Sequence, residues 1–485
     1  DATRSAGQRE VLDSFWREAV QGDAQLRHRV SFALSQIFVV SLVDSNVANH
    51  PRGVAGYMDM LSYHAFGNFR DLLEGVARHP MMGIYLSHLR NQKEDPATGR
   101  VPDQNFAREV MQLFSIGLNQ LNQDGTPVID GQGRPVNSYG SDDIVGLSHV
   151  FTGFSWYSAG TEDACFRGYS QCQDPDRTWR PMKGYPKFHS TAEKRFLGRV
   201  VAAQSSADPD ASLKEALDAL FAHPNVGPFI GRQLIQRLVT SNPSPQYVAR
   251  VARAFDGAGG GTRGDMKAVI RAVLLDSEAR SMVHAADPAY GKLREPVLRL
   301  TAFLRAFRAA SDSGRFLIGV TDNPGTQLGQ TPMRAPSVFN FYRPGYVAPG
   351  TALAEEGLVA PEMQITHETT VAGYANYMLS AVRNGVGQRG VDYQAPRNDV
   401  QPDYSRELAL AEQPAELVER MNQLLLYGQM TAALRSEIEG AVQAIMIPAL
   451  NATGSNQAAI DTARRNRVLA AVFLTLVSPE FIVQK

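Results

Sequence analysis

The chain has 485 residues, of which 44% are hydrophobic and 20% charged, with a net charge of −1 and a pI of about 6.9. This composition is typical of a globular protein with a large core. Lys and Arg are spread along the chain without a basic block, which argues against a general nucleic-acid-binding protein. No apolar run reaches about 18 residues, so no transmembrane helix is predicted. A start at Asp1, without Met or a signal peptide, suggests a mature or trimmed product.

Apolar residues recur at three- and four-residue spacing through most of the chain, which predicts helices. These segments are 11–43, 57–61, 69–77, 81–89, 213–222, 229–239, 247–255, 265–275, 292–307, 365–382, 414–426, 432–445 and 462–477. Prolines after His79 and His223 end two of them. We therefore predict an all-α fold: one large multi-helix domain over residues 1–485, with a small β-hairpin insertion and long irregular loops.

Two insertions interrupt the helical pattern. In residues 119–141, Asp-Gly turns at Asp124 and Asp130 flank the β-branched pair Val128-Ile129, which predicts a small hairpin. Residues 155–195 form a long segment without periodicity, and loops of this length are usually functional or decorative.

The irregular segment holds the two cysteines of the chain, Cys165 and Cys172. Their spacing favours a short disulfide over a zinc site, because tetrahedral zinc needs two more ligands and only His189 follows nearby. A disulfide indicates an oxidising compartment, either a periplasm or the exterior. The alternative is a pair of reduced thiols without a role.

The segment 103–117, Asp-Gln-Asn-Phe-Ala-Arg-Glu-Val-Met-Gln-Leu-Phe-Ser-Ile-Gly, predicts a helix with Asp103 as N-cap and Gly117 as the residue after its end. Its apolar arc opposes a polar arc of Asn105, Arg108, Glu109 and Gln112. That polar arc is either an ordinary solvated face or a functional one. It contains no Lys, only groups that make directed hydrogen bonds, so we expect Arg108 and Glu109 to turn inward.

These and other stretches make the chain similar to the domain-of-unknown-function 1800 family of bacterial proteins. The segments that carry the resemblance are 29–38 (RVSFALSQIF), 66–73 (FGNFRDLL), 105–109 (NFARE), 142–143 (DD), 151–153 (FTG), Lys194 with 196–198 (FLG), 293–296 (LREP) and 478–481 (SPEF). The Trp-His-Asn-His-Phe segment of other members is missing here. The resemblance implies an exported bacterial protein, often encoded beside a phosphatase/sulfatase-like partner, but it supplies no reaction.

Glu109 and Asp143 are the best candidates for a catalytic carboxylate pair, because both lie on family-like stretches. If their helices pack together, one acid has a raised pKa while Arg108 holds the other ionised, which is the division that glycosidic cleavage requires. The alternative is a structural network in which Arg108 ties helices together. Buried charges must be paired in either case, so pairing alone does not decide between the two.

His189 is a further candidate general base, although a single loop histidine is more often structural. Arg334, Asn340 and Tyr342 lie in an aromatic, proline-rich loop and, with Asn105, are candidates for binding a sugar or an anion. The alternative for this loop is simple anchoring to the core.

Common nucleophile and metal motifs are missing, including Gly-x-Ser-x-Gly, His-Glu-x-x-His and Cys-x-x-Cys-His. No metal site is predicted, and the sequence leaves the cofactor open, non-covalent haem included. Two functions remain. The first is a periplasmic or secreted hydrolase or lyase acting on an envelope or extracellular polymer such as polysaccharide. The second is a non-catalytic helical binding or assembly protein of the cell surface.

Overall fold

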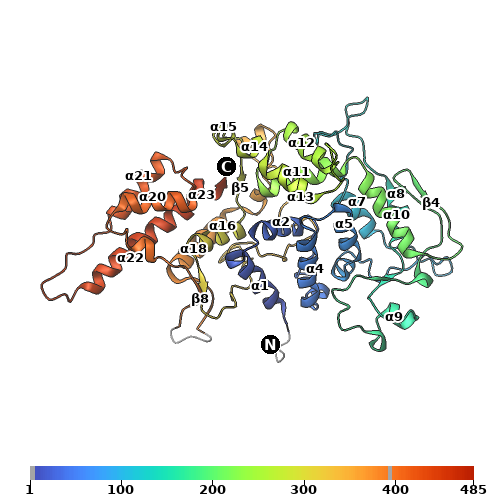
Figure 1. The fold of residues 1–485 in the computed structure, drawn as a ribbon, viewed down its shortest axis with the longest axis horizontal. Coiled ribbons are helices and arrows are strands. Elements are labelled where there is room, and N and C mark those ends of the chain that lie inside the picture. Colours follow the sequence, from blue (N-terminus) through green and yellow to red (C-terminus); the bar gives the residue numbers. More distant parts are fainter. Residues whose placement is uncertain (1–5, 391–395) are drawn as a thin grey trace. The chain divides into compact units, whose positions relative to one another are not determined.

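The computed structural model describes residues 6–390 and 396–485. The fold is mainly helical with a few short antiparallel strands, as predicted (Figure 1). Among the described residues, no helix is both long enough and apolar enough to cross a membrane. The chain divides into two compact units, and the single-domain organisation stays a prediction.

The first unit consists mainly of Leu26–Tyr290 and Met333–Asn340. Its helices are α2 (Gln25–Ser35), α3 (Ser45–Ala48), α4 (Pro51–His64), α5 (Phe69–Arg78), α6 (Pro80–Tyr85), α7 (Asn105–Gln112), α8 (Ser141–Val150), α9 (Asp163–Arg167), α10 (Pro209–Ala222), α11 (Val226–Leu238), α12 (Pro245–Phe255), α13 (Met266–Leu275), α14 (Ser277–Arg280) and α15 (Met282–Ala285). Two short antiparallel strand pairs complete it: β1 (Phe154–Ser155) with β2 (Lys183–Gly184), and β3 (Lys194–Phe196) with β4 (Arg199–Val201). The unit also contains the 3-10 turns η1 (Ser170–Cys172) and η2 (Pro186–Phe188).

Aromatic rings from distant helices form the centre of this unit. Phe38 lies 5.4 Å from Phe114 and 6.3 Å from Phe69, measured between ring centroids. Phe106 of α7 lies 4.7 Å from Phe151, edge to face, a geometry that aromatic pairs favour. All of these rings are buried, so they connect α5 and α7 to the residue that follows α8.

Helix α7 is shorter than the segment 103–117 that predicted it. The N-cap is Gln104, whose side chain makes no capping hydrogen bond, so the predicted N-cap at Asp103 is wrong by one residue. The Asp103 carboxylate still accepts the Asn105 N–H at 2.7 Å. After Gln112 the chain winds more widely, and the Ile116 and Gly117 amides both donate to the Met111 carbonyl at 3.0 Å. Gly117 adopts φ +73°, the left-handed conformation expected after a helix end.

The predicted hairpin at 119–141 folds as two successive turns with three short arms. Bridges join Asn119 to Asn137, Leu121 to Pro127, and Ile129 to Pro135. Backbone hydrogen bonds of 2.8–2.9 Å connect the three arms in a cycle: the Gln120 N–H donates to the Val136 carbonyl, Val136 to Val128, and Val128 to Gln120. The insertion is thus held mainly by backbone pairing, as its turn-rich sequence predicts.

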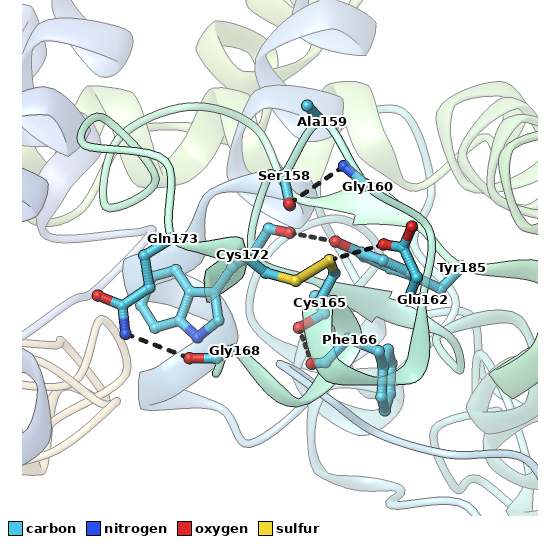
Figure 2. Close-up of a disulfide and its surroundings, with 12 residues drawn as sticks. Ser158, Ala159, Gly160, Glu162, Cys165, Phe166, Gly168, Cys172, Gln173 and Tyr185 are labelled. Carbon is cyan, nitrogen blue, oxygen red and sulfur yellow. Dashed lines mark hydrogen bonds between the residues drawn. A yellow bond between two sulfur atoms is a disulfide. The ribbon is translucent and has the colours of Figure 1, made fainter. Parts of the chain in front are cut away.

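Cys165 and Cys172 form the predicted disulfide within the irregular segment (Figure 2). Cys165 and Phe166 are buried with Tyr185 and Phe188 in a small core of their own. The Lys183 ammonium donates to the Ser158 and Gly160 carbonyls at 3.0 and 2.9 Å. These contacts order a segment that has little regular structure.

The second unit comprises Arg9–Gln25, Gly291–Pro332 and Phe341–Lys485. Its elements are α1 (Gln8–Gln21), β5 (Lys292–Leu293), α16 (Pro296–Ala306), β6 (Ala310–Ser311), α17 (Ala352–Glu355), η3 (Pro361–Ile365), α18 (Glu368–Asn384), β7 (Val386–Arg389), β8 (Asn398–Gln401), α19 (Ser405–Leu408), α20 (Pro414–Leu425), α21 (Ala432–Gln443), α22 (Gln457–Leu476), α23 (Pro479–Ile482) and β9 (Val483–Gln484). β5 pairs with β9, and β8 lies between β6 and β7, all antiparallel.

Charged side chains are buried in the second unit. The Lys292 ammonium lies 2.8 Å from the Glu362 carboxylate, with side chains 0% and 2% exposed. Glu295 is also buried and accepts hydrogen bonds from Gln330 at 2.5 Å and Tyr342 at 3.0 Å. Burial raises the pKa of Glu362, Lys292 lowers it, and Glu295 raises it again. The net effect is a raised pKa for Glu362, with burial as the largest cause.

Asp13 of α1 fixes this helix to the loop at Gly319. The Gly319 N–H donates to its carboxylate at 3.0 Å, and the Trp16 indole donates to the Gly319 carbonyl at 3.0 Å. Burial raises the pKa of Asp13 to about 6, although Arg9 and the Gly319 amide lower it.

Stability is therefore expected to fall as the pH rises through the folded pKa of Asp13. Its ordinary pKa of 3.8 is below the folded value of about 6, so between these values the folded chain binds more protons than the unfolded chain. A shift of this size corresponds to about 2 to 3 kcal/mol in the free energy of unfolding. Denaturant titrations of the wild type and of Asp13→Asn at several pH values measure it. A pH dependence that is the same in both proteins would refute this assignment.

Candidate functional site

Three family-like stretches of the first unit meet where α8 packs on β3. Gly146 of α8 allows this contact, because a Cβ there would lie 1.7 Å from the Arg195 carbonyl oxygen of β3. Asp143 reinforces it, since one carboxylate oxygen accepts the Leu197 N–H at 2.6 Å and the other accepts the Gly140 N–H at 2.7 Å. Helix α8 and the β3–β4 hairpin are thus joined by close backbone contact at Gly146 and by the Asp143 carboxylate.

A polar loop is held beside this junction by backbone hydrogen bonds on both flanks. The Lys93 N–H donates to the Phe188 carbonyl at 2.9 Å, and the Gly153 N–H donates to the Asn91 carbonyl at 2.8 Å. Gly153 has φ +79°, and a Cβ there would lie 2.9 Å from the His189 backbone, so a side chain does not fit. The loop consequently presents Glu94 to the end of α8.

Glu94, His149 and Ser190 form a hydrogen-bonded cluster at this point. One Glu94 oxygen lies 3.0 Å from His149 Nδ1, and the other accepts the Ser190 hydroxyl at 2.9 Å. Ser190 Oγ also lies 3.1 Å from His149 Nδ1. Ser190 is buried, whereas the side chains of His149 and Glu94 are 19% and 32% exposed. The cluster therefore reaches solvent through its histidine and its carboxylate.

The partners of His149 define its tautomer. A carboxylate only accepts hydrogen bonds, so Nδ1 carries the proton that faces Glu94. In the neutral ring Nε2 is then the nitrogen with the free electron pair, and it has no hydrogen-bond partner among the described residues. A partly exposed imidazole with a carboxylate behind it has the arrangement of a general base.

Hydrogen bonds from its neighbours favour the ionised form of Glu94. Burial raises the pKa of Glu94, but its backbone amide, Ser190 and His149 together lower it below the ordinary value. Lys194 is fully buried and donates to the Ser190 and Ala192 carbonyls at 2.8 and 3.2 Å, which fixes the turn that carries Ser190. Burial lowers the pKa of Lys194, and Glu94 opposes this shift.

His189, predicted as a candidate base, is fully buried. Its Nδ1 lies 2.8 Å from the Thr152 carbonyl and its Nε2 lies 2.9 Å from the Ser212 hydroxyl. Burial lowers the pKa of His189 to about 4. Both nitrogens are engaged within the protein, so this histidine joins the end of η2 to Thr152, which follows α8, and to α10 rather than facing solvent.

The polar arc of α7 divides in the structure. Glu109 is 7% exposed, and burial raises its pKa while Arg108 lowers it. Its Oε2 has no hydrogen-bond partner among the described residues. Arg108 is exposed, so the prediction that it turns inward is wrong. The burial of Glu109 does not require Arg108 to be buried, because adjacent residues on a helix point about 100° apart. Asn105 is exposed and donates weakly to Ser87 at 3.4 Å.

The candidate binding residues of the aromatic loop belong to both units: Arg334 and Asn340 to the first, and Tyr342 to the second. In the first unit, Arg334 donates to Gln8 at 3.4 Å, and Asn340 is buried with φ +64°. In the second, Tyr342 is buried and donates to Glu295 at 3.0 Å. Tyr342 therefore anchors its loop to a buried carboxylate, and the binding roles of Arg334 and Asn340 stay predictions.

Glu162, Cys165 and Cys172 bring potential metal-ligand atoms within 4.8 Å of one another. Both sulfur atoms are bound in the disulfide, so they offer no thiolate to a metal ion (Figure 2). The Glu162 carboxylate lies 3.1 Å from the Cys165 sulfur. This group supports a structural role for the segment.

Sequence reasoning missed Glu94, His149 and Ser190. His149 lies in an apolar helix, and Glu94 lies in a polar loop without periodicity. The one available signal was proximity to family-like stretches, since His149 precedes Phe151-Thr152-Gly153 and Ser190 precedes Lys194.

The fold and cluster define a mainly helical protein with small β insertions and a buried serine behind a histidine–carboxylate pair. A family model described as "Protein of unknown function (DUF1800)" matches residues 1–483, and the chain belongs to that family. Neither a curated protein nor a solved structure matches the chain.

Proposed function

We propose that this protein is a hydrolase or lyase that acts on an envelope or extracellular polymer such as polysaccharide, with His149 as its general base. The observation that supports the proposal is the orientation of His149. Its Nδ1 is held by Glu94, its Nε2 has no hydrogen-bond partner among the described residues, and its ring is partly exposed. A proton acceptor with its second nitrogen fixed by a carboxylate is suited to repeated proton transfer.

The chemistry that this geometry offers is proton removal. In hydrolysis, Nε2 takes a proton from the attacking water, and the imidazolium returns it to the leaving oxygen. In elimination, Nε2 takes a proton from carbon while the neighbouring C–O bond breaks, a C=C bond forms, and the imidazolium gives the proton to the leaving oxygen. Glu94 is ionised in either case and stabilises the imidazolium. This assignment replaces the pair of Glu109 and Asp143, because backbone amides already occupy both Asp143 oxygens.

The proposed periplasmic or secreted location is consistent with a polymer substrate. The disulfide is of the kind that persists in oxidising compartments. The family resemblance likewise implies export, and a phosphatase/sulfatase-like partner stays a prediction from that resemblance.

The second candidate is a non-catalytic binding or assembly protein of the cell surface. It is favoured by the intramolecular use of Asp143 and His189, whose polar atoms all hold elements of the first unit together. On this account Glu94 and His149 are one more connection between a loop and α8.

Replacing His149 by Gln is expected to lower turnover by roughly 10² to 10⁴-fold, the usual contribution of a general base. The wild type is first screened with alginate, polygalacturonate, chitosan and peptidoglycan. New reducing ends report hydrolysis, and the ultraviolet absorbance of unsaturated ends reports elimination. Glu94→Gln should also change the pH profile, because the imidazolium loses its carboxylate.

His284→Gln is the matched control, since His284 is also partly exposed and its ring makes no hydrogen bond with the described residues. It should leave both turnover and Tm unchanged. Full activity of His149→Gln at an unchanged Tm would refute the proposal. Polymer binding without turnover by the wild type would favour the second candidate.

A further inference from the structure

A cavity of about 310 Å³ lies within the second unit, among segments far apart in the sequence. Arg383 lies at the end of α18, and Arg465 lies in α22. Arg397 immediately precedes β8, and Gln401 is the last residue of that strand. Tyr404 is buried in its wall and donates its hydroxyl to the Val382 carbonyl at 3.1 Å. The cavity is thus formed by three arginines over a fixed aromatic wall.

The carboxylate in the wall is already engaged. One oxygen of Asp403 accepts the Ser405 N–H at 2.9 Å, and the other lies 2.5 Å from the Arg308 guanidinium. Arg397 is also neutralised, because it donates to both oxygens of Asp312 at 2.6 and 2.7 Å. The carboxylates of Asp403 and Asp312 therefore do not neutralise the two remaining arginines, Arg383 and Arg465.

Arg383 and Arg465 keep their positive charge in the cavity wall. Arg465 donates to the Arg383 carbonyl at 3.1 Å, which holds the ends of α18 and α22 together. Among the described residues, no carboxylate lies within 4 Å of either guanidinium. Two exposed guanidinium groups with no carboxylate partner among residues 6–390 and 396–485 give the described cavity wall a local excess of positive charge.

We propose that this cavity binds an oxyanion carried on a group no larger than a monosaccharide: a carboxylate, sulfate or phosphate. Guanidinium groups match the planar, multiple acceptors of such anions better than any other side chain. The cavity volume is at the lower end of the range for small-molecule sites. It is larger than the volume of a bare ion and suits a single sugar acid or sugar ester. This site is separate from the Glu94–His149 pair and does not depend on the proposed function.

Calorimetric titration of the full chain tests the proposal with three probes: inorganic phosphate, sulfate and glucuronate, each at constant ionic strength set with chloride. We expect saturable binding of at least one probe. The double variant Arg383→Gln/Arg465→Gln should bind it about tenfold or more weakly, because charge-assisted hydrogen bonds are lost. Tighter binding of glucuronate than of both inorganic ions would identify a sugar acid as the ligand, and the reverse order would identify a free ion or ester.

Arg464→Gln is the matched control, because Arg464 lies next to Arg465 on α22 but pairs with Glu412. It should bind the probe as the wild type does, and the Tm of each variant verifies folding. Two results would overturn the proposal: no binding of any probe to the wild type, or equal losses in the double variant and in Arg464→Gln.

Discussion

Replacing Lys292 by Met is expected to lower the free energy of unfolding by about 3 to 5 kcal/mol. The Lys292 and Glu362 side chains are 0% and 2% exposed and lie 2.8 Å apart, so the variant leaves a carboxylate buried beside a methionine. Glu295 adds to the cost, because it already raises the pKa of Glu362. Chemical denaturation of the wild type and variant measures the difference.

The double variant Lys292→Met/Glu362→Met separates the charge from the packing. Removing both charges should recover most of the loss, since apolar side chains of similar size replace buried ion pairs at little cost. The deficit of the single variant should also shrink as the pH falls, because a protonated Glu362 no longer carries a buried charge. A single variant that matches the wild type at neutral pH would contradict this account.

Replacing Gly146 by Ala is expected to destabilise the protein by roughly 3 kcal/mol, at the upper end of overpacking effects. The new Cβ would lie 1.7 Å from the Arg195 carbonyl oxygen, which belongs to the backbone of β3 and has no rotamer to change. Helix and strand must therefore separate. That movement would also disturb Lys194, which holds the turn of Ser190.

Gly440→Ala is the control for the helix position itself. Gly440 lies in α21, and a Cβ there meets no atom within 4 Å. Alanine should raise the free energy of unfolding there by about 0.5 to 1 kcal/mol, because glycine is the poorer helix former. Melting curves of the two variants should therefore move in opposite directions. A shift of the same sign in both would show that the contact with β3 relaxes easily.

Periodicity predicted the helices well because it reports which face of a segment is buried. Phe106 and Val110 of α7 are buried as their spacing requires, and Gly117 has the predicted left-handed φ. The early end of α7 was not predictable, because it depends on how the chain winds after Gln112. The exposure of Arg108 was likewise missed, since composition identified a polar arc but did not show which of its residues are buried.

The candidate site could not be derived from periodicity. Glu94 is 55 residues from His149 and 96 residues from Ser190 in the sequence. Their meeting depends on the Lys93–Phe188 and Gly153–Asn91 backbone bonds, which leave no mark on side-chain spacing. The disulfide was predictable for the opposite reason, because its two residues lie only seven positions apart.

That short separation limits what the disulfide does for the molecule. A crosslink restrains the unfolded chain in proportion to the logarithm of the loop it closes, and a loop this small corresponds to about 2 to 3 kcal/mol. Its sulfurs contact the small core of Phe166, Tyr185 and Phe188. The Phe188 carbonyl also accepts the Lys93 N–H, which holds the loop that carries Glu94. The crosslinked segment and the polar cluster therefore share Phe188, so the disulfide supports one flank of the candidate site.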